Sequence, residues 1–143
     1  TVKQNADDIV NLSNDLATHK AESVTGVVMI TEPFDQTTKT TVDLGFKPKN
    51  ITVESCILQS EYASSGAQKN GSGGYSRYRN VGSSYWEIGG PAISFKENGS
   101  NYIYGAITMT ATGLEIDWTV NGTLTGASGN RRVIISAITH GEG

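Results

Sequence analysis

The 143-residue sequence contains a single cysteine, Cys56, and only two histidines, His19 and His140. One cysteine excludes an intrachain disulfide, and so few thiols and imidazoles exclude a Cys/His zinc cluster. Cys56 lies within an apolar strand pattern, and free cysteine is among the most buried residue types, so we expect an inert, buried thiol. The sequence therefore predicts neither a metal site nor a cofactor.

Charge and long apolar runs are also scarce. Charged residues make up 17% of the chain and the formal net charge is −3, which argues against broad attraction to nucleic acid. No apolar run approaches the ~20 residues needed to span a bilayer, so we expect no membrane insertion. The chain starts Thr-Val-Lys-Gln, with neither an initiator Met nor a signal peptide, which suggests a fragment or a processed C-terminal piece of a longer protein.

Residue patterns for catalysis are equally sparse. Glu115 and Asp117 share one strand face, and a carboxylate pair can flank a glycosidic bond, but a solvated strand face explains them as well. The glycine-rich residues 71–74 lack the Lys-Ser/Thr ending of a phosphate loop. No nucleophile with an adjacent base is apparent, so we expect no enzymatic activity.

What the sequence does contain is β-strand patterning. Seventeen glycines, three prolines and frequent Thr and Ser are typical of many short strands joined by tight turns. From Val24 onward apolar residues alternate with polar ones, which predicts an all-β, antiparallel β-sandwich or a small barrel. The final strand, residues 132–139, is apolar on both faces, so we expect it to be central or to face another subunit.

Turn chemistry accompanies these strands. Asn-Gly pairs are suited to turns with positive φ, and we expect hairpins at Asn98-Gly99 and at Asn121-Gly122. A Gly-Phe-Lys-Pro sequence at residues 45–48 predicts a corner. The Asn-Gly pairs are Asn70-Gly71, Asn98-Gly99 and Asn121-Gly122.

The same alternation sorts the aromatic residues. Trp118 shares a face with Leu114, Ile116 and Val120, and Trp86 shares one with Ile88, so both tryptophans are predicted to lie in the core rather than to form ligand platforms. Tyr102 and Tyr104 oppose Ile103 and Ile107, which leaves these two tyrosines on an outer or intersubunit face.

The first 22 residues follow a heptad instead. The narrow apolar stripe favours a seam between several helices, although a single amphipathic helix packed on its own domain is the alternative. An isolated helix of this length is marginal in water and needs partners. We therefore expect a coiled-coil stalk over residues 1–22 and a head over residues 23–143. The predicted seam positions are Val2, Ile9 and Leu16 at a, with Asn5, Leu12 and His19 at d.

The segment 60–84 has no sustained apolar period, which predicts a long loop. Its tyrosines offer rigid aromatic surface, and its arginines can donate paired hydrogen bonds to an anion. Small, adaptable residues surround them, so the segment is a candidate binding segment. A mobile loop without function, or a Tyr-Arg strand whose outward side chains only aid solubility, is the alternative. The candidate contact residues are Tyr75, Arg77, Tyr78, Arg79 and Tyr85.

Two short motifs carry a resemblance. The Leu-Ala-Thr-His-Lys-Ala-Glu turn at residues 16–22 and the Leu-Gly-Phe-Lys-Pro-Lys corner at residues 44–49 resemble the C-terminal stalk and head of bacteriophage tail fibre or receptor-binding proteins. The head also resembles the H-type lectin sandwich, without a clear sugar motif of that family. The resemblance implies a homotrimer on the virion tail, assembled in the host cytoplasm and released by lysis. Its partners would be other phage tail proteins and a bacterial cell-surface saccharide, such as a wall polysaccharide or teichoic acid.

Two other functions fit the same layout. The chain could be a purely structural baseplate or fibre subunit that trimerises and docks, or a glycan depolymerase. In a trimer, Asn5 and His19 could each form a ring of three that holds water or an ion, although His19 could equally splay outward as the chains diverge. Several weak sugar sites on one particle would raise avidity.

Overall fold

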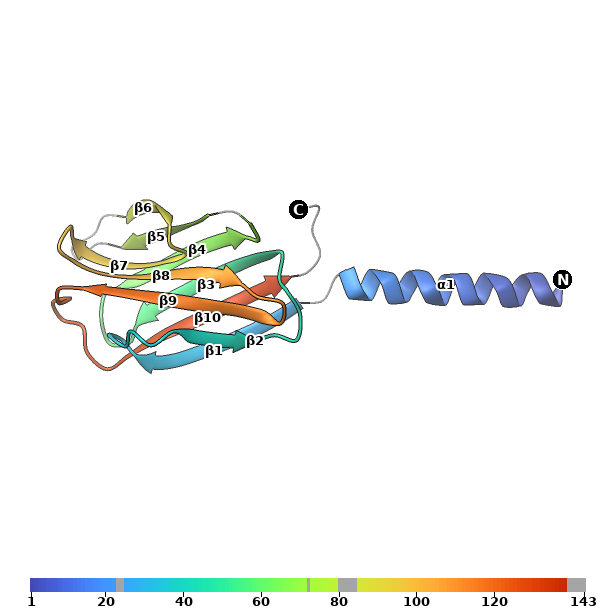
Figure 1. Ribbon diagram of the computed structural model, residues 1–143, viewed down its shortest axis with the longest axis horizontal. Coiled ribbons are helices and arrows are strands. Elements are labelled where there is room, and N and C mark those ends of the chain that lie inside the picture. Colours follow the sequence, from blue (N-terminus) through green and yellow to red (C-terminus); the bar gives the residue numbers. More distant parts are fainter. Residues whose placement is uncertain (23–24, 72, 80–84, 139–143) are drawn as a thin grey trace.

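The protein consists of one helix and, within the described residues, ten strands (Figure 1). The computed structural model describes residues 1–22, 25–71, 73–79 and 85–138, and only the backbone at residues 15–22, 25, 79, 85–87 and 138. The elements are α1 (Val2–Glu22), β1 (Thr25–Pro33), β2 (Thr40–Asp43), β3 (Asn50–Ile57), β4 (Ala63–Lys69), β5 (Gly74–Arg79), β6 (Tyr85–Gly90), β7 (Ile93–Asn98), β8 (Asn101–Met109), β9 (Gly113–Asn121) and β10 (Asn130–Ile138).

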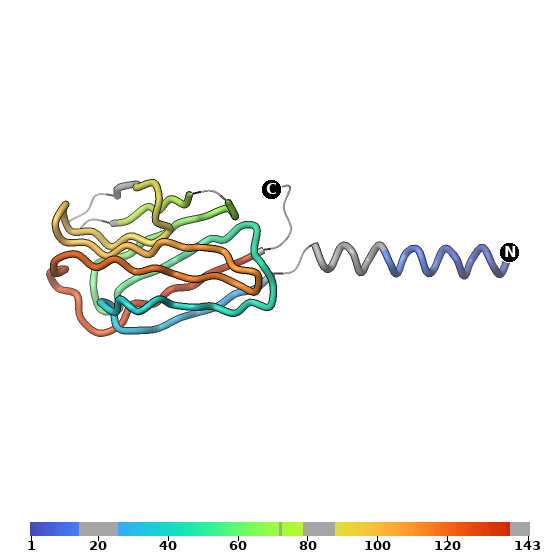
Figure 2. Tube along the Cα trace, viewed as in Figure 1, coloured from blue at the N-terminus to red at the C-terminus, as the bar shows by residue number. Residues whose placement is uncertain are grey.

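The strands form two antiparallel sheets packed face to face. The larger sheet has the order β1-β10-β3-β4-β5-β6, and the smaller has the order β2-β9-β8-β7. The tube in Figure 2 shows the first strand beside the last, in agreement with the pairing of β1 and β10. This confirms the all-β antiparallel sandwich. It also confirms that the last strand is central in its sheet, because β10 lies between β1 and β3.

The core lies between the sheets and follows the predicted alternation. Val53, Leu114, Ile116 and Val133 are fully buried, and Trp118 on the same face of β9 is 7% exposed. Trp118 is therefore a core residue as predicted. The side chain of Trp86, also predicted for the core, lies outside the described residues.

A buried cation joins the two sheets. Arg131 on β10 is fully buried, and its Nη2 lies 2.8 Å from Oε1 of Glu32 on β1. Its guanidinium also lies 3.5 Å from the ring centroid of Trp118 on β9. Thr40 on β2 accepts a hydrogen bond from Trp118 Nε1 (2.8 Å) and donates one to Glu32 (2.9 Å). Burial lowers the pKa of Arg131, and the hydrogen bond that its guanidinium donates to Glu32 opposes that shift.

The predicted turns are correct at two sites and wrong at one. Gly71, between the end of β4 and the start of β5, has φ 79°. Asn98 closes the β7–β8 hairpin by accepting hydrogen bonds from the backbone of Ser100 (2.9 Å) and Asn101 (3.0 Å). Gly122 has φ 66°, but it does not form a hairpin. The chain crosses to the larger sheet after β9, where β10 pairs with β1 on one side and with β3 on the other.

The corner at residues 45–48 is present as predicted and connects β2 to β3. Gly45 has φ 76°, and its N–H lies 2.9 Å from Oδ1 of Asp43 and 3.0 Å from the carbonyl oxygen of Thr112. Phe46 packs against the core, and Pro48 is buried. The corner thus seals one end of the sandwich.

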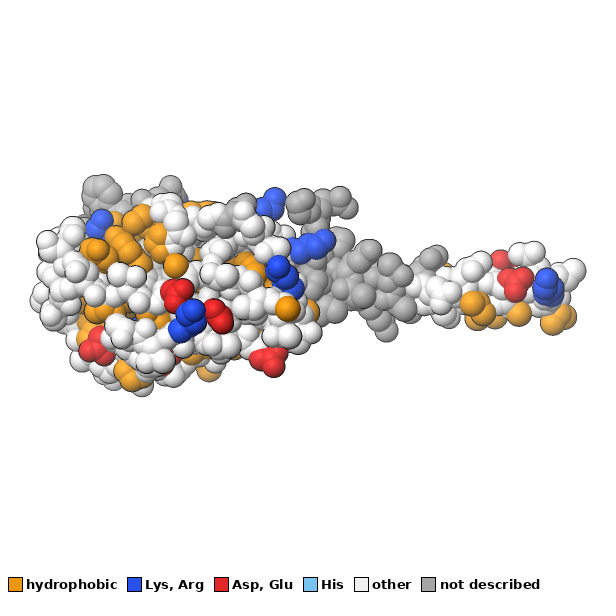
Figure 3. Space-filling view, viewed as in Figure 1, with side chains coloured by type: hydrophobic (Ala, Val, Ile, Leu, Met, Phe, Trp, Pro, Cys, Tyr) orange, Lys and Arg blue, Asp and Glu red, His pale blue; other side chains and the backbone are white. Residues whose placement is uncertain are grey.

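The helix α1 extends away from the sandwich in Figure 1. The hydroxyl of Thr1 caps its first turn by accepting a hydrogen bond from the N–H of Gln4 (3.1 Å). Every side chain of residues 1–14 is exposed, and Figure 3 shows apolar side chains along one edge of the described helix surface. The alternative of a helix packed on its own domain is therefore wrong for the described part of α1, whose apolar stripe contacts no strand.

Candidate functional site

The candidate site lies on the outer face of the larger sheet, across strands β3, β4 and β5. The strands are adjacent and antiparallel, so side chains with the same pleat direction form rows across them. One row contains Thr52, Ala67 and Tyr75, and the next contains Glu54, Ser65 and Arg77.

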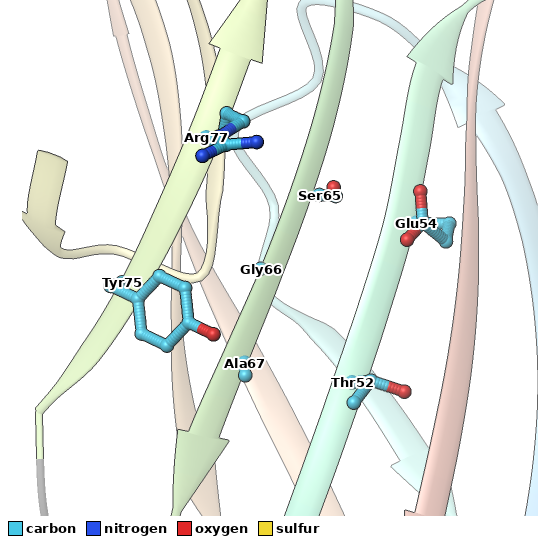
Figure 4. Close-up of a pocket in the computed structure, with 7 residues that line it drawn as sticks. All are labelled: Thr52, Glu54, Ser65, Gly66, Ala67, Tyr75 and Arg77. Atoms are coloured by element: carbon cyan, nitrogen blue, oxygen red, sulfur yellow. The ribbon is translucent and has the colours of Figure 1, made fainter. Parts of the chain in front are cut away.

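Side-chain size along the rows produces a hollow. The middle strand carries only Ser65, Gly66 and Ala67 at this point, whereas longer side chains rise from both neighbouring strands (Figure 4). The resulting depression has a volume of about 400 Å³. Tyr75 and Arg77 form one wall, and Glu54 forms the other.

Beneath the floor of the hollow, β4 is held close to β7. A Cβ at Gly66 would clash with the carbonyl oxygen of Ala92, so only glycine permits this approach. Beside it, the N–H of Ser94 donates to Ser64 Oγ (3.0 Å), and the hydroxyls of Ser94 and Ser76 lie 2.5 Å apart. Buried serines therefore take the place of an apolar face here, with their hydroxyls satisfied.

The two charged walls have opposite sign. Glu54 and Arg77 are both exposed and are separated by the width of β4. Two strand spacings place their backbones about 10 Å apart, enough for a ring-sized ligand between them. The arginine can donate several hydrogen bonds and the carboxylate can accept several, while the Tyr75 ring, 58% exposed, offers an apolar surface.

A second hollow of about 290 Å³ continues on the other side of Tyr75. It shares Thr52 and Ala67 with the first and is bounded further along by Asn50 and Lys69. Tyr75 thus stands in the middle of a longer groove across the sheet.

The structure brings together two of the five predicted contact residues. Tyr75 and Arg77 lie on the outer face, but Tyr78 is 6% exposed and points to the opposite side of β5. Its prediction as a contact residue is wrong, because alternation along a strand sends residue 78 inward when 75 and 77 face outward. The side chains of Arg79 and Tyr85 lie outside those described, although the register pairs the two residues across β5 and β6.

The predicted loop over residues 60–84 is also wrong, since this segment contains β4 and β5, and β5 is the Tyr-Arg strand given as the alternative. Strand β4 was missed because Ser64 and Gly66 occupy inward positions where apolar residues would reveal a strand. Sequence reasoning also missed Thr52 and Glu54 as members of the site. Their alternation with Ile51 and Val53 indicated that their side chains face outward. Nothing in the sequence indicated that β5, which carries Tyr75 and Arg77, would lie two strands away in the same sheet.

The helix presents the described part of the predicted seam to solvent. Val2, Ile9 and Leu12 are 87%, 67% and 71% exposed, and Asn5 is exposed as well. Val10, beside this stripe, is 57% exposed. The side chains of Leu16 and His19 lie outside the described residues.

Other residues singled out from the sequence lie elsewhere. Tyr102 and Tyr104 stack on the outer face of the smaller sheet with ring centroids 4.3 Å apart. Glu115 and Asp117 share Lys39, whose Nζ lies 3.3 Å and 3.6 Å from their oxygens, and the hydrogen bond with Glu115 raises the pKa of Lys39.

Cys56 also differs from its prediction. It was expected to be buried, but it is half-buried, because its position on β3 falls on the pleat that points away from the core.

The described part of the chain holds no group of three or more His, Cys, Asp or Glu side chains arranged to bind a metal ion. The same residues contain no helix with the length and apolar character needed to cross a membrane. Comparison with protein-family models, with curated proteins and with solved structures found no match.

Proposed function

We propose that this chain is the stalk and head of a bacteriophage tail fibre or receptor-binding protein, and that its head attaches the virion to host cell-surface carbohydrate. Three copies would assemble through α1, and each head would contribute one weak site. The observation that carries this proposal is the hollow beside Tyr75, in which an exposed aromatic ring, a guanidinium and a carboxylate surround a floor of small residues.

The chemistry of the hollow suits a saccharide. A sugar ring has an apolar face of C–H groups that packs on an aromatic ring, and a rim of hydroxyls that both donate and accept hydrogen bonds. Tyr75 supplies the first contact, and Arg77 and Glu54 supply the second. Because the two charged walls have opposite sign, a neutral or zwitterionic cell-wall polymer suits the hollow.

The same residues support binding rather than cleavage. The carboxylates that the sequence suggested as a hydrolytic pair, Glu115 and Asp117, are on the smaller sheet and share an ion-pair partner in Lys39. Glu54 is the one carboxylate among the described residues that line the hollow. We therefore propose a non-enzymatic function.

Binding to purified host wall polysaccharide and to intact host cells tests this proposal. We expect the wild-type chain to bind both, and Tyr75→Ala and Arg77→Ala each to weaken binding by about tenfold or more, as for central contacts in other interfaces. Tyr102→Ala is the matched control, since it removes a half-buried tyrosine from the outer face of the other sheet.

The outcome also separates the alternatives. A purely structural fibre subunit would bind neither cells nor polymer. A depolymerase would shorten the polymer during incubation, whereas the proposed head leaves its length unchanged.

A further inference from the structure

Exposed large apolar side chains gather on two surfaces that follow one another along the chain. One is the stripe on α1, and the other lies on the outer face of β1 and β10. On the second surface, Val27 is 72% exposed, Met29 is 61% exposed and Ile134 is 39% exposed. Met29 and Ile134 are register partners, and Val27 is two residues before Met29, so the three form one contiguous apolar patch. We call these three residues the β1 patch.

The β1 patch has the anatomy of a protein contact. On one side it is bordered by Thr31 and Arg132, which share a 3.5 Å contact between Thr31 Oγ1 and Arg132 Nε, and on another by Ser136. An apolar centre with a polar rim is typical of protein–protein contacts, whereas the hollow beside Tyr75 combines polar and aromatic groups. The outer face of the larger sheet is thus divided into an apolar part at β1 and β10 and a polar part at β3 to β5.

β1 is also an edge strand, since β10 is its one neighbour among the strands that the structure describes. A nine-residue edge strand with exposed apolar side chains invites pairing with other chains, and proteins generally cover or break such edges. Covering the β1 patch would remove this hazard.

The position of the β1 patch in the chain identifies its partner. α1 ends at Glu22 and Val27 is only five residues further on, a reach of at most about 18 Å even for an extended chain. If the apolar stripes of several α1 helices meet on one axis, the β1 patch of each copy is kept close to the neighbouring heads. Assembly through α1 would thus hold the head of a second copy of this chain near each β1 patch.

We infer that the β1 patch is the contact between heads, and that it packs against a neighbouring copy of the same chain. This inference rests on the proposed assembly through α1. The β1 patch adjoins the hollow beside Tyr75, because Ile134 on β10 is the register partner of Glu54 on β3.

The test is the concentration dependence of the assembled mass, measured by sedimentation for the full chain. We expect Met29→Glu to raise the dissociation concentration of the assembly about tenfold or more, because a carboxylate would be desolvated at the contact. Met29→Thr, which suits a strand and adds no charge, should shift it in the same direction by a smaller factor. Thr119→Glu is the control, since it adds the same charge to an exposed strand position on the other sheet.

The outcomes distinguish the two levels of the proposal. An assembled wild type whose dissociation is unchanged by both Met29 variants would overturn the β1 patch as a contact and leave assembly through α1 standing. A wild type that is monomeric throughout would overturn both. Denaturant unfolding of each variant checks that altered mass reflects assembly rather than loss of the fold.

Discussion

At the scale of single residues, Arg131 is the most constrained polar side chain in the core. Besides Glu32 and Trp118, it reaches the backbone carbonyl oxygens of Phe34 (2.7 Å) and Gln36 (2.8 Å). It therefore fixes the segment after β1, while its stack on Trp118 connects the two sheets. All of its described partners depend on one guanidinium geometry, which lysine cannot reproduce.

We expect Arg131→Ala to lower the free energy of unfolding by about 3–5 kcal/mol, because it leaves the mostly buried Glu32 without its cation. Urea denaturation measures the loss. The neighbouring Arg132→Ala is the control and should change stability by less than about 1 kcal/mol, since Arg132 makes only an exposed contact. Equal losses in the two variants would contradict a special role for Arg131.

Tyr62 provides a pH-dependent prediction. It is 1% exposed, its hydroxyl donates a 2.8 Å hydrogen bond to the carbonyl oxygen of Thr125, and burial, with smaller contributions from Glu97 and Glu61, raises its pKa above the ordinary 10.0. The folded state therefore holds the proton more tightly than the unfolded state. Its stabilising contribution is complete below pH 10.0 and is lost as pH rises through the folded-state pKa.

We accordingly expect the wild type to lose stability more steeply than Tyr62→Phe as pH rises above about 10. At neutral pH, Tyr62→Phe should cost about 1 kcal/mol for the lost hydrogen bond. Chemical denaturation at a series of pH values measures both effects. Parallel pH profiles for the two proteins would show that Tyr62 does not contribute to the alkaline loss.

At the scale of elements, the close approach of β4 and β7 shapes the candidate site. Gly66 lies under the hollow, and the position of a Cβ there would fall on the carbonyl oxygen of Ala92 and 2.7 Å from that of Tyr75. Strand β4 therefore needs small residues on both of its faces. Gly66 allows the close approach to β7, and Ser65 and Ala67 form the floor of the hollow.

We expect Gly66→Ala to lower stability by about 1–3 kcal/mol or more, because backbone atoms rather than a flexible side chain occupy the space. It should also weaken carbohydrate binding, since displacement of β4 would alter the walls of the hollow. Thermal unfolding and the polysaccharide assay measure the two effects. Gly89→Ala is the control, because nothing lies within 4 Å of a Cβ there.

At the scale of the whole molecule, the main question is how many copies meet along α1. The stripe of Val2, Ile9 and Leu12 is exposed in the single chain, and the frequent Asn, Asp, Ser and Thr of α1 give it a modest helix propensity of its own. Both facts favour association of several copies, and the resemblance to phage tail fibres predicts three.

We expect the wild-type chain to have the mass of a trimer in solution and the double variant Ile9→Asp/Leu12→Asp to have that of a monomer, because charges would face the seam. Light scattering at micromolar concentration measures this. Asn11→Asp/Asn14→Asp carries the same added charge at positions away from the seam and should remain trimeric. A double seam variant that still forms trimers would mean that the heads alone hold the assembly.

The sequence by itself determined the local features that depend on neighbouring residues. Period-two alternation placed Leu114, Ile116 and Trp118 inward, the doubly apolar pattern placed β10 between two other strands, and the heptad placed Ile9 and Leu12 on one helix edge. These features follow from the fixed geometry of strands and helices, in which spacing along the chain sets the direction of each side chain.

Only the tertiary structure decided which distant strands are neighbours. Strand β4 was hidden because the hydrogen-bonded Ser64 and Gly66 replace the apolar face that usually reveals a strand. The pairing of β3 with β4 brought Glu54 opposite Arg77, the pleat of β5 buried Tyr78, and the crossover after Asn121 replaced an expected hairpin. The physical reason is that strand order depends on how whole faces pack across the sandwich, which local spacing does not encode.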